Sequence, residues 1–402
     1  MHIKQPYCPD CGPAQTNHLV ARINAASNLF ISLPLEKATI GVSKKLPPWL
    51  FQFVFETIPA FLLRTSSKLH IGRMEKKPQK GDSDRSRCLW EEAIRRGIVM
   101  EEFCIAGNTP GIFIASWNGE SICFQDVPRP REPGSQSLAW MDNKKIMREH
   151  FATAGIPIAT GGVARTWKDA QRLFGTLRKP LITKPHEGSR SRHTTIHIET
   201  LGAFKIGFEK AKKLSAWVIV EEELRGMVYR GSVIGGKTVA VICREPPHAI
   251  GDGRTTIRDL VAKENSRPER QGPIFHTIEL GKEAEEELKR QGLSLQSIPE
   301  KGRFVSLNQK VGRGVGASMS DVTDDIHPDN RKLLEDAAAE LNDPVVGIDF
   351  IIGDIKVSWK EQDRSGIIEC NSLPFIDLHH YPLSGKPRNV AGAVWDIIFP
   401  GS

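Results

Sequence analysis

Two apolar segments near the end of the chain carry polar side chains whose chemistry needs an explanation. Asp349 lies in VVGIDFII, and Glu369 and Asn371 lie in GIIECN. Side chains two apart on a strand share a face, so Glu369 and Asn371 point together and Cys370 points away. Two carboxylates and an amide from adjacent strands are oxygen ligands that suit Mg²⁺ bridging substrate phosphates. The alternative is a pair of strand-end acids, in water or paired with arginine.

Two further segments could hold a nucleotide. LITKPHEGSRSRH places Lys184 at the end of an apolar strand, before a Gly-, Ser- and Arg-containing stretch that could face phosphates. WVIVEEELRG runs from an apolar strand into Glu221, Glu222 and Glu223, where backbone groups could meet an adenine edge. A solvated loop and a charged strand end are the simpler alternatives. Since neither GxGxxG nor a Walker A motif is present, Rossmann and P-loop folds are unsupported.

The elements that must position these residues mix helices with antiparallel hairpins. MDNKKIMREHFATAG predicts a helix from about Asp142 that stops at Gly155, and Thr166 is the expected N-cap of another. Hairpins are expected at Asn118-Gly119 and at Gly235-Gly236. The pattern predicts an α+β fold, with breaks at MEKKPQKGDSDRSR and PRPREPG.

Composition restricts the classes of partner and compartment. The 402 residues are 39% hydrophobic and 26% charged, with a net charge of +7, which is ordinary for a globular protein of two or three domains. The sequence has no Lys/Arg block and no aromatic ladder, so we do not expect it to bind nucleic acid. Seven cysteines without a disulfide pattern and no signal peptide predict a cytoplasmic protein. The apolar stretch 46–63 contains Gln52, Glu56 and Pro59, so we expect a helix packed on the protein or a partner rather than a membrane span.

The CPDC motif at the N-terminus is half of a zinc site. Cys8 and Cys11 have the required spacing, but no second CxxC follows, and only His2 and His18 lie nearby. Three alternatives stay open: zinc bound within one chain, zinc bound with ligands from a second chain, and an unligated turn at a loose terminus.

Several longer motifs resemble the ATP-grasp family, and within it the ATP-grasp part of the cyanophycin synthetases. They are VIVEEELRGMVYRGSVIGGKTVAVICREPPHAIGDGRTTIRDLV, ASMSDVTDDIHPDN and IIECNSLPFIDLHHYPLSGKPRNVAGAVWDIIFP. The resemblance covers roughly residues 138–400. It implies an N-terminal, partly helical region over 1–84, a small α/β domain over 85–137, and an ATP-grasp domain over 138–402 with a lid at about 155–225.

The resemblance also implies an activity. ATP lies between two antiparallel sheets, a carboxylate is phosphorylated, an amine attacks the acyl phosphate, and ADP and phosphate leave. Amino acids or small peptides, anionic in character, are the implied substrates of a homo-oligomeric enzyme that needs neither nucleic acid nor membrane. No Ser, Cys or His nucleophile is required.

Site residues carry over by position. The phosphates would meet Lys144 and Lys184, beneath a lid loop that begins at Glu187, Gly188 and Ser189. Adenine would meet Glu221, Glu222 and Leu224, the last two through the backbone. One or two Mg²⁺ or Mn²⁺ ions would bind Asp349, Glu369 and Asn371. Arg244, and by a weaker match Arg230, would steady the phosphoryl group or the substrate carboxylate.

Three departures leave other functions open. Val228 stands where the family has an acid for the ribose hydroxyls, and the lid loop GSRSRH lacks its second glycine and carries Arg190 and Arg192. The second ligase domain of cyanophycin synthetases is not expected in this chain. A catalytically silent nucleotide-binding sensor or scaffold, or an acyl-phosphate-forming kinase acting with a partner, are therefore alternatives.

Overall fold

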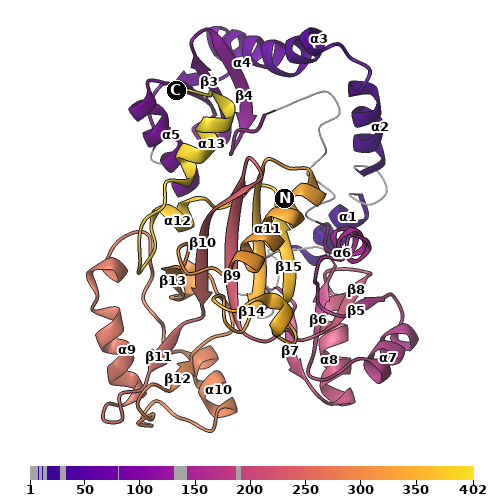
Figure 1. Ribbon diagram of the computed structural model, residues 1–402, viewed down its shortest axis with the longest axis vertical. Coiled ribbons are helices and arrows are strands. Elements are labelled where there is room, and N and C mark those ends of the chain that lie inside the picture. Colours follow the sequence, from indigo (N-terminus) through magenta and orange to yellow (C-terminus); the bar gives the residue numbers. More distant parts are fainter. Residues whose placement is uncertain are drawn as a thin grey trace.

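The computed structural model describes Cys8, Cys11 and residues 16–27, 33–79, 81–130, 143–186 and 192–402. Strands in these parts form sheets of four, five, two and four strands (Figure 1). Each larger sheet is antiparallel and packs against helices, which confirms the predicted α+β class.

The central five-stranded sheet has the order β13-β10-β9-β14-β15. Its strands are β9 (Met227–Ile234), β10 (Lys237–Glu245), β13 (Ser318–Asp321), β14 (Val345–Ile352) and β15 (Gly366–Asn371). The predicted hairpin at Gly235-Gly236 joins β9 to β10, and both glycines have positive φ. Alternate residues of these strands pack on α6 (Lys144–Thr153) and α11 (Pro328–Leu341). On the other face, Ile234, Ala240 and Val345 pack in the core that includes the C-terminal helix, and the polar side chains lie further along the same strands.

Helix α11 crosses in front of the central sheet in Figure 1. It starts after His327 with Pro328 in its first turn and ends at Asn342 in the left-handed conformation. Gly231 makes close packing possible, since a Cβ there would lie 2.5 Å from a methyl carbon of Leu334. A ligand could therefore approach the sheet only from the face opposite α11, on the part that the C-terminal helices do not cover.

The lid sheet has the order β5-β8-β6-β7. It comprises β5 (Gly161–Ala164), β6 (Leu181–Pro185), β7 (Thr195–Ile198) and β8 (Val218–Glu222), with α7 (Trp167–Thr176) and α8 (Leu201–Lys212) on one face. The prediction of Thr166 as an N-cap is confirmed, because its side chain accepts from the backbone N–H of Asp169 in a full capping box.

An N-terminal sheet has the order β1-β2-β3-β4 and lies at the top of Figure 1. Its elements are β1 (Arg73–Glu75), β2 (Val99–Ile105), β3 (Asn108–Trp117), β4 (Glu120–Gln125) and α5 (Asp84–Arg96). The predicted Asn118-Gly119 turn joins β3 to β4, with both residues at positive φ. Trp395 of the C-terminal helix α13 (Val390–Ile398) packs into the same core. The domain boundary at residue 84 stays a prediction, and β1 on one side of it pairs with β2 on the other.

Helices precede this sheet: α1 (His18–Ser27), α2 (Leu33–Ser43), α3 (Pro48–Gln52), the π-helix η3 (Phe53–Thr57) and α4 (Ile58–Lys68). Glu56 is buried and accepts a hydrogen bond from the backbone N–H of Cys123 at 2.7 Å, which fixes the π-helix to β4. Trp49 and Phe61 are two thirds exposed. Among the described residues, we find no helix whose length and apolarity would let it span a bilayer.

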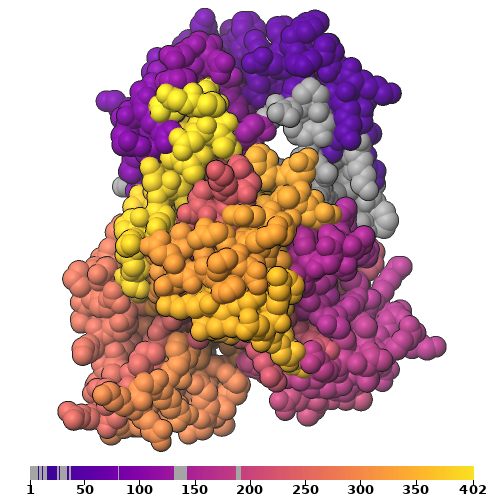
Figure 2. Space-filling model, viewed as in Figure 1, coloured from indigo at the N-terminus to yellow at the C-terminus, as the bar shows by residue number. Residues whose placement is uncertain are grey.

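A fourth lobe follows β10. It contains β11 (His248–Ile250), α9 (Ile257–Asn265), α10 (Lys282–Arg290) and β12 (Phe304–Ser306) around its own apolar core. Short helices complete the chain: η4 (Pro268–Gln271), η5 (Arg313–Val315), η6 (Trp359–Glu361) and α12 (Asp377–His380). Figure 2 shows this lobe and the lid lobe standing apart at the lower edge of the molecule.

Candidate active site

Charged side chains form a row across three strands of the central sheet. Asp349 of β14 lies opposite Arg230 on β9 and opposite Glu369 on β15. Directly opposed residues of an antiparallel pair share a face, so all three point to the same side. Arg244 of β10 points to that side too, because it is two residues beyond Ile242, the register partner of Arg230. This face lies opposite α11.

Asp349 is held by two arginines. Its Oδ1 accepts from Nε of Arg230, and its Oδ2 accepts from Nη2 of Arg230 at 2.7 Å and from Nη1 of Arg244 at 3.0 Å. Asp349 is 3% exposed, and burial alone would raise its pKa. The two guanidinium groups outweigh burial and hold the pKa of Asp349 below its usual value.

Glu369 and Asn371 are the more accessible members of the predicted magnesium set. The Glu369 side chain is 32% exposed, and Lys144 Nζ lies 3.4 Å from its Oε1. The Asn371 amide donates to the Gly347 carbonyl at 3.4 Å, an interaction that involves its nitrogen and not its oxygen. Cys370 lies in the core on the α11 side, so the alternation expected for GIIECN is confirmed.

The donor set fits a hard cation, with one restriction. Glu369, Asn371 and Asp349 offer oxygens on one face of adjacent strands, which is the chemistry that Mg²⁺ prefers. A carboxylate has about four lone-pair sites, and arginine hydrogen bonds already use three at Asp349. Glu369 is therefore the better placed first ligand, and Asp349 mainly orients the arginines.

A second set of charges lies on the lid sheet, on the face away from α7 and α8. Lys184 Nζ of β6 lies 2.5 Å from Oε1 of Glu221 on β8, and Nη1 of Arg148 lies 2.6 Å from Oε2. Burial lowers the pKa of Lys184, and repulsion from Arg148 and Lys144 adds to this, while Glu221 opposes it. Lys184, which the sequence predicted to contact phosphates, is therefore fixed in position by the buried carboxylate of Glu221.

Helix α6 links the two sets. Lys144 contacts Glu369 of the central sheet, and Arg148, one turn later, contacts Glu221 of the lid. Helix α6 begins at Lys144, two residues after the Asp142 expected from sequence, with Asn143 as the N-cap. Sequence reasoning did not single out Arg148, although its i+4 spacing from Lys144 places both on one helix face.

Of the residues predicted to contact adenine, Glu221 and Glu222 point to opposite faces of β8. Glu221 gives its carboxylate to Lys184 and Arg148, whereas Glu222 points to the other face and accepts from Nε of Arg178 at 2.9 Å. The N–H of Glu222 donates to the carbonyl of Thr160, so this N–H is not available to a base. Leu224 follows β8 and is half-buried.

The remaining residues considered in the sequence differ in how they relate to the site. Glu187, Gly188, Ser189 and Arg190 fall outside the described residues. Val228 faces the site side of β9, opposite Arg244 and Ile351, and supplies no ribose acceptor. Arg313 of η5 pairs with Asp377 and, at 3.8 Å, with Asp84.

Unpaired donors and net charge favour an anionic ligand. Among the described residues, Nη1 of Arg230 and Nε of Arg244 are buried and find no acceptor. Counted over the part of the chain that the structure describes, the linked network contains more cations than acids: Lys144, Arg148, Lys184, Arg230 and Arg244 against Glu221, Asp349 and Glu369. An excess of positive charge beside buried donors is suited to phosphates.

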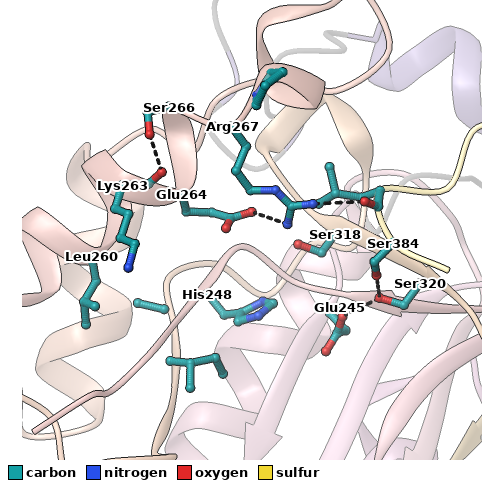
Figure 3. A pocket seen from close by; sticks show the side chains of 14 residues that line it. Glu245, His248, Leu260, Lys263, Glu264, Ser266, Arg267, Ser318, Ser320 and Ser384 are labelled. Carbon is teal, nitrogen blue, oxygen red and sulfur yellow. Dashed lines mark hydrogen bonds and ion pairs between the residues drawn. The ribbon is translucent and has the colours of Figure 1, made fainter.

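A pocket of about 580 Å³ lies beyond the edge of the central sheet (Figure 3). Its lining includes Glu245, whose carboxylate accepts from Ser320, and Arg267, which pairs with Glu264. Glu245 follows Arg244 on β10, so the two side chains point to opposite faces. The pocket consequently lies away from Asp349 and does not belong to the charged network.

Comparison with known proteins supports this fold. No family model matches the chain. It is 33% identical over 262 residues to cyanophycin synthetase of Trichormus variabilis, a match that covers 64% of this chain and 29% of that protein. It is 30% identical over 318 residues to the glutathione biosynthesis bifunctional protein GshAB of Clostridium perfringens, covering 77% of this chain and 40% of that one.

A solved structure is similar over a larger part of the chain. The crystal structure of a bifunctional glutathione synthetase from Pasteurella multocida superposes with a TM-score of 0.58 and 25% identity, over 79% of this chain and 44% of that one. The chain thus spans less than half the length of each of these relatives. The antiparallel sheets and these similarities confirm the predicted ATP-grasp fold and the predicted resemblance to the ATP-grasp part of cyanophycin synthetase.

Proposed function

We propose that this protein is an ATP-dependent ligase that joins a carboxylate to an amine, with amino acids or small peptides as substrates. The observation that carries the proposal is the charged network that α6 makes continuous between the lid sheet and the central sheet. The relatives whose names indicate peptide synthesis, cyanophycin synthetase and GshAB, support the reaction class.

The residues suit activation of a carboxylate by phosphorylation. A carboxylate does not condense with an amine in water. Transfer of the terminal phosphoryl group of ATP to the carboxylate releases ADP and gives an acyl phosphate, from which the amine displaces phosphate to form the amide. Lys144 and Lys184 would hold the phosphates, and Mg²⁺ at Glu369 and Asn371 would neutralise charge on them when bound. Positioned cations, rather than a protein nucleophile, are what phosphoryl transfer needs.

Arg230 and Arg244 would bind the transferring group or the substrate carboxylate. Each has a buried nitrogen that finds no acceptor among the described residues. Asp349 orients both guanidinium groups through the hydrogen bonds described above, so in this proposal it is a positioning residue that shares a lone pair with the metal.

The finer parts of the proposal concern ions, assembly and location. Mn²⁺ could replace Mg²⁺ at the same oxygens, and a second ion would need ligands beyond Asp349, whose arginine hydrogen bonds leave only about one lone-pair site. A homo-oligomer is supported by the exposed Trp49, Phe53 and Phe61 near the top of the molecule. A cytoplasmic location fits the cysteine content.

Phosphate release tests the reaction. The full chain is mixed with ATP, Mg²⁺ and a panel of amino acids and peptides, singly and in pairs. We expect release only with a suitable carboxylate and amine together. Glu369→Gln should abolish it, while Asp336→Asn, an exposed carboxylate on α11, should leave it unchanged. ATP binding without release in any mixture would contradict the proposal.

Val228 favours a second candidate, a silent nucleotide-binding protein. An apolar side chain at the ribose position provides no acceptor for the hydroxyls. This candidate predicts that ATP binds equally well to Glu369→Gln and to the natural chain. It also predicts that Val228→Glu raises ATP affinity without creating turnover, which calorimetry and the release assay together would reveal.

A further inference from the structure

Four side chains with metal-binding atoms meet where the N-terminal segment touches the lid. They are Cys8, Cys11, His18 and His193, and their ligand atoms all lie within 4.8 Å of one another. Nε2 of His193 is 3.6 Å from Sγ of Cys8 and 3.4 Å from Sγ of Cys11, and Nε2 of His18 is 3.4 Å from Sγ of Cys11. None of them belongs to the charged network of the candidate active site.

These separations match the edges of a zinc tetrahedron. With Zn–S of about 2.3 Å and Zn–N of about 2.0–2.1 Å, tetrahedral geometry requires S···N separations of about 3.5 Å. The rings of His18 and His193 stand nearly perpendicular, at 89°, with centroids 4.9 Å apart, so both nitrogens reach the sulfurs without stacking. Two thiolates and two imidazoles in a tetrahedron are a typical zinc donor set.

His193 is oriented for this role by a second contact. Its Nδ1 lies 2.8 Å from the carbonyl oxygen of Lys210 on α8, so Nδ1 carries the proton and Nε2 keeps its lone pair for the sulfur side. His193 is fully buried and adopts φ of +54°, a conformation rare for a residue with a Cβ. Backbone strain and burial at a potential ligand are expected when a bound group holds the residue in place.

We propose that Cys8, Cys11, His18 and His193 bind one structural zinc ion within a single chain. Four protein ligands leave no open position, and Cys11 is 4% exposed, so the ion would be closed to substrate. The CPDC motif left open zinc within one chain, zinc shared with a second chain, and an unligated turn; the proposal selects the first of these. The fourth ligand follows Cys11 by 182 residues, so spacing could not reveal it.

The ion would fasten the N-terminal segment to the lid. His193 lies two residues before β7 and hydrogen-bonds to the Lys210 carbonyl of α8. Cys8 and Cys11 precede α1 in the chain, and His18 is its first residue; α1 stands beside α6 and the lid lobe in Figure 1. Zinc would therefore tie the first helix to the part of the fold that closes over the nucleotide in the proposed function. The site itself does not depend on that function.

Metal content of the full chain tests the site. Protein produced with zinc in the medium and purified without chelator should contain about one zinc per chain by plasma mass spectrometry. Cys11→Ser and His193→Gln should each lose most of it. The matched variants Cys104→Ser, in β2, and His150→Gln, half-exposed on α6, should retain it.

Cobalt substitution keeps the test valid if a ligand variant does not fold. The natural chain reconstituted with Co²⁺ should show the intense visible bands of tetrahedral cobalt and a thiolate-to-metal charge-transfer band, both bleached by added zinc. Absence of these bands, or stoichiometric zinc retained by Cys11→Ser and His193→Gln, would overturn the proposal. Loss of turnover without loss of zinc would concern the ligase proposal alone.

Discussion

Replacing Asp349 by asparagine should lower the free energy of unfolding much more than replacing Glu369, the residue opposite it, by glutamine. Asp349 and Glu369 lie opposite one another on β14 and β15, so Asp349→Asn and Glu369→Gln are matched changes at neighbouring positions. The Asp349 side chain is 4% exposed and pairs with Arg230, at 5%, and Arg244, at 17%. Removing its charge deprives both guanidinium groups of the carboxylate that they hydrogen-bond directly.

The expected magnitudes follow from this burial. Breaking a buried ion pair by removing one partner costs about 3–5 kcal/mol, and Asp349→Asn should fall in that range. Glu369 is one third exposed and has a single lysine at 3.4 Å, so Glu369→Gln should cost about 0–1 kcal/mol. Since the arginines lower the pKa of Asp349, its contribution is present above the unfolded pKa of about 3.9 and is lost as pH falls through the folded value.

Urea unfolding of the three proteins at pH 7, with hydrogen exchange of β14 peptides as a local readout, measures these costs. We expect a large drop in midpoint and in β14 protection for Asp349→Asn only. The difference between the two variants should shrink below about pH 4. Equal, small effects of both changes would refute the inference that two arginines bind Asp349 in the native state.

Three further changes probe other parts of the molecule. Burial and Asp82 raise the pKa of Glu102 from 4.5 to about 8, so stability should fall as pH rises through this window, and Glu102→Gln should remove the fall in urea titrations. Lys184→Met removes the phosphate lysine and leaves Glu221 with one cation, so calorimetry should show ATP affinity at least about tenfold weaker, or about 1.4 kcal/mol. Gly226→Ala should cost at least about 1–3 kcal/mol in thermal unfolding, because φ is +121° and a Cβ would lie 2.0 Å from a carbonyl oxygen of β14; an unchanged midpoint would contradict the assigned conformation.

Local patterns in the sequence were sufficient for many elements. Capping chemistry at Thr166, the Asn-Gly turn at Asn118 and the alternation around Cys370 are confirmed because each depends on residues a few positions apart. The same alternation put Glu369 and Asn371 on one face.

Contacts between distant segments were not predictable from periodicity. The sequence left open whether Asp349 and Glu369 pair with arginine. The structure shows such a pair at Asp349, because the strand order places Arg230 of β9 opposite it. Glu369 instead lies beside a lysine, Lys144. Nothing near Glu221 in sequence indicates that Arg148 of another element would share its carboxylate with Lys184. Ion pairs of this kind depend on which strands and helices are neighbours. The order of the strands was implied by the family resemblance and could not be predicted from the local sequence.

Isotope transfer tests the central claim most directly. In the proposed reaction, a substrate carboxylate attacks the terminal phosphorus of ATP, and the amine later displaces phosphate from the acyl carbon. One carboxylate oxygen must therefore end in the released phosphate. With a panel of amino acids labelled with oxygen-18 in the carboxylate, Mg²⁺ and ATP, we predict that the phosphate carries one labelled oxygen. Unlabelled phosphate, or no phosphate from any substrate mixture, would contradict the account.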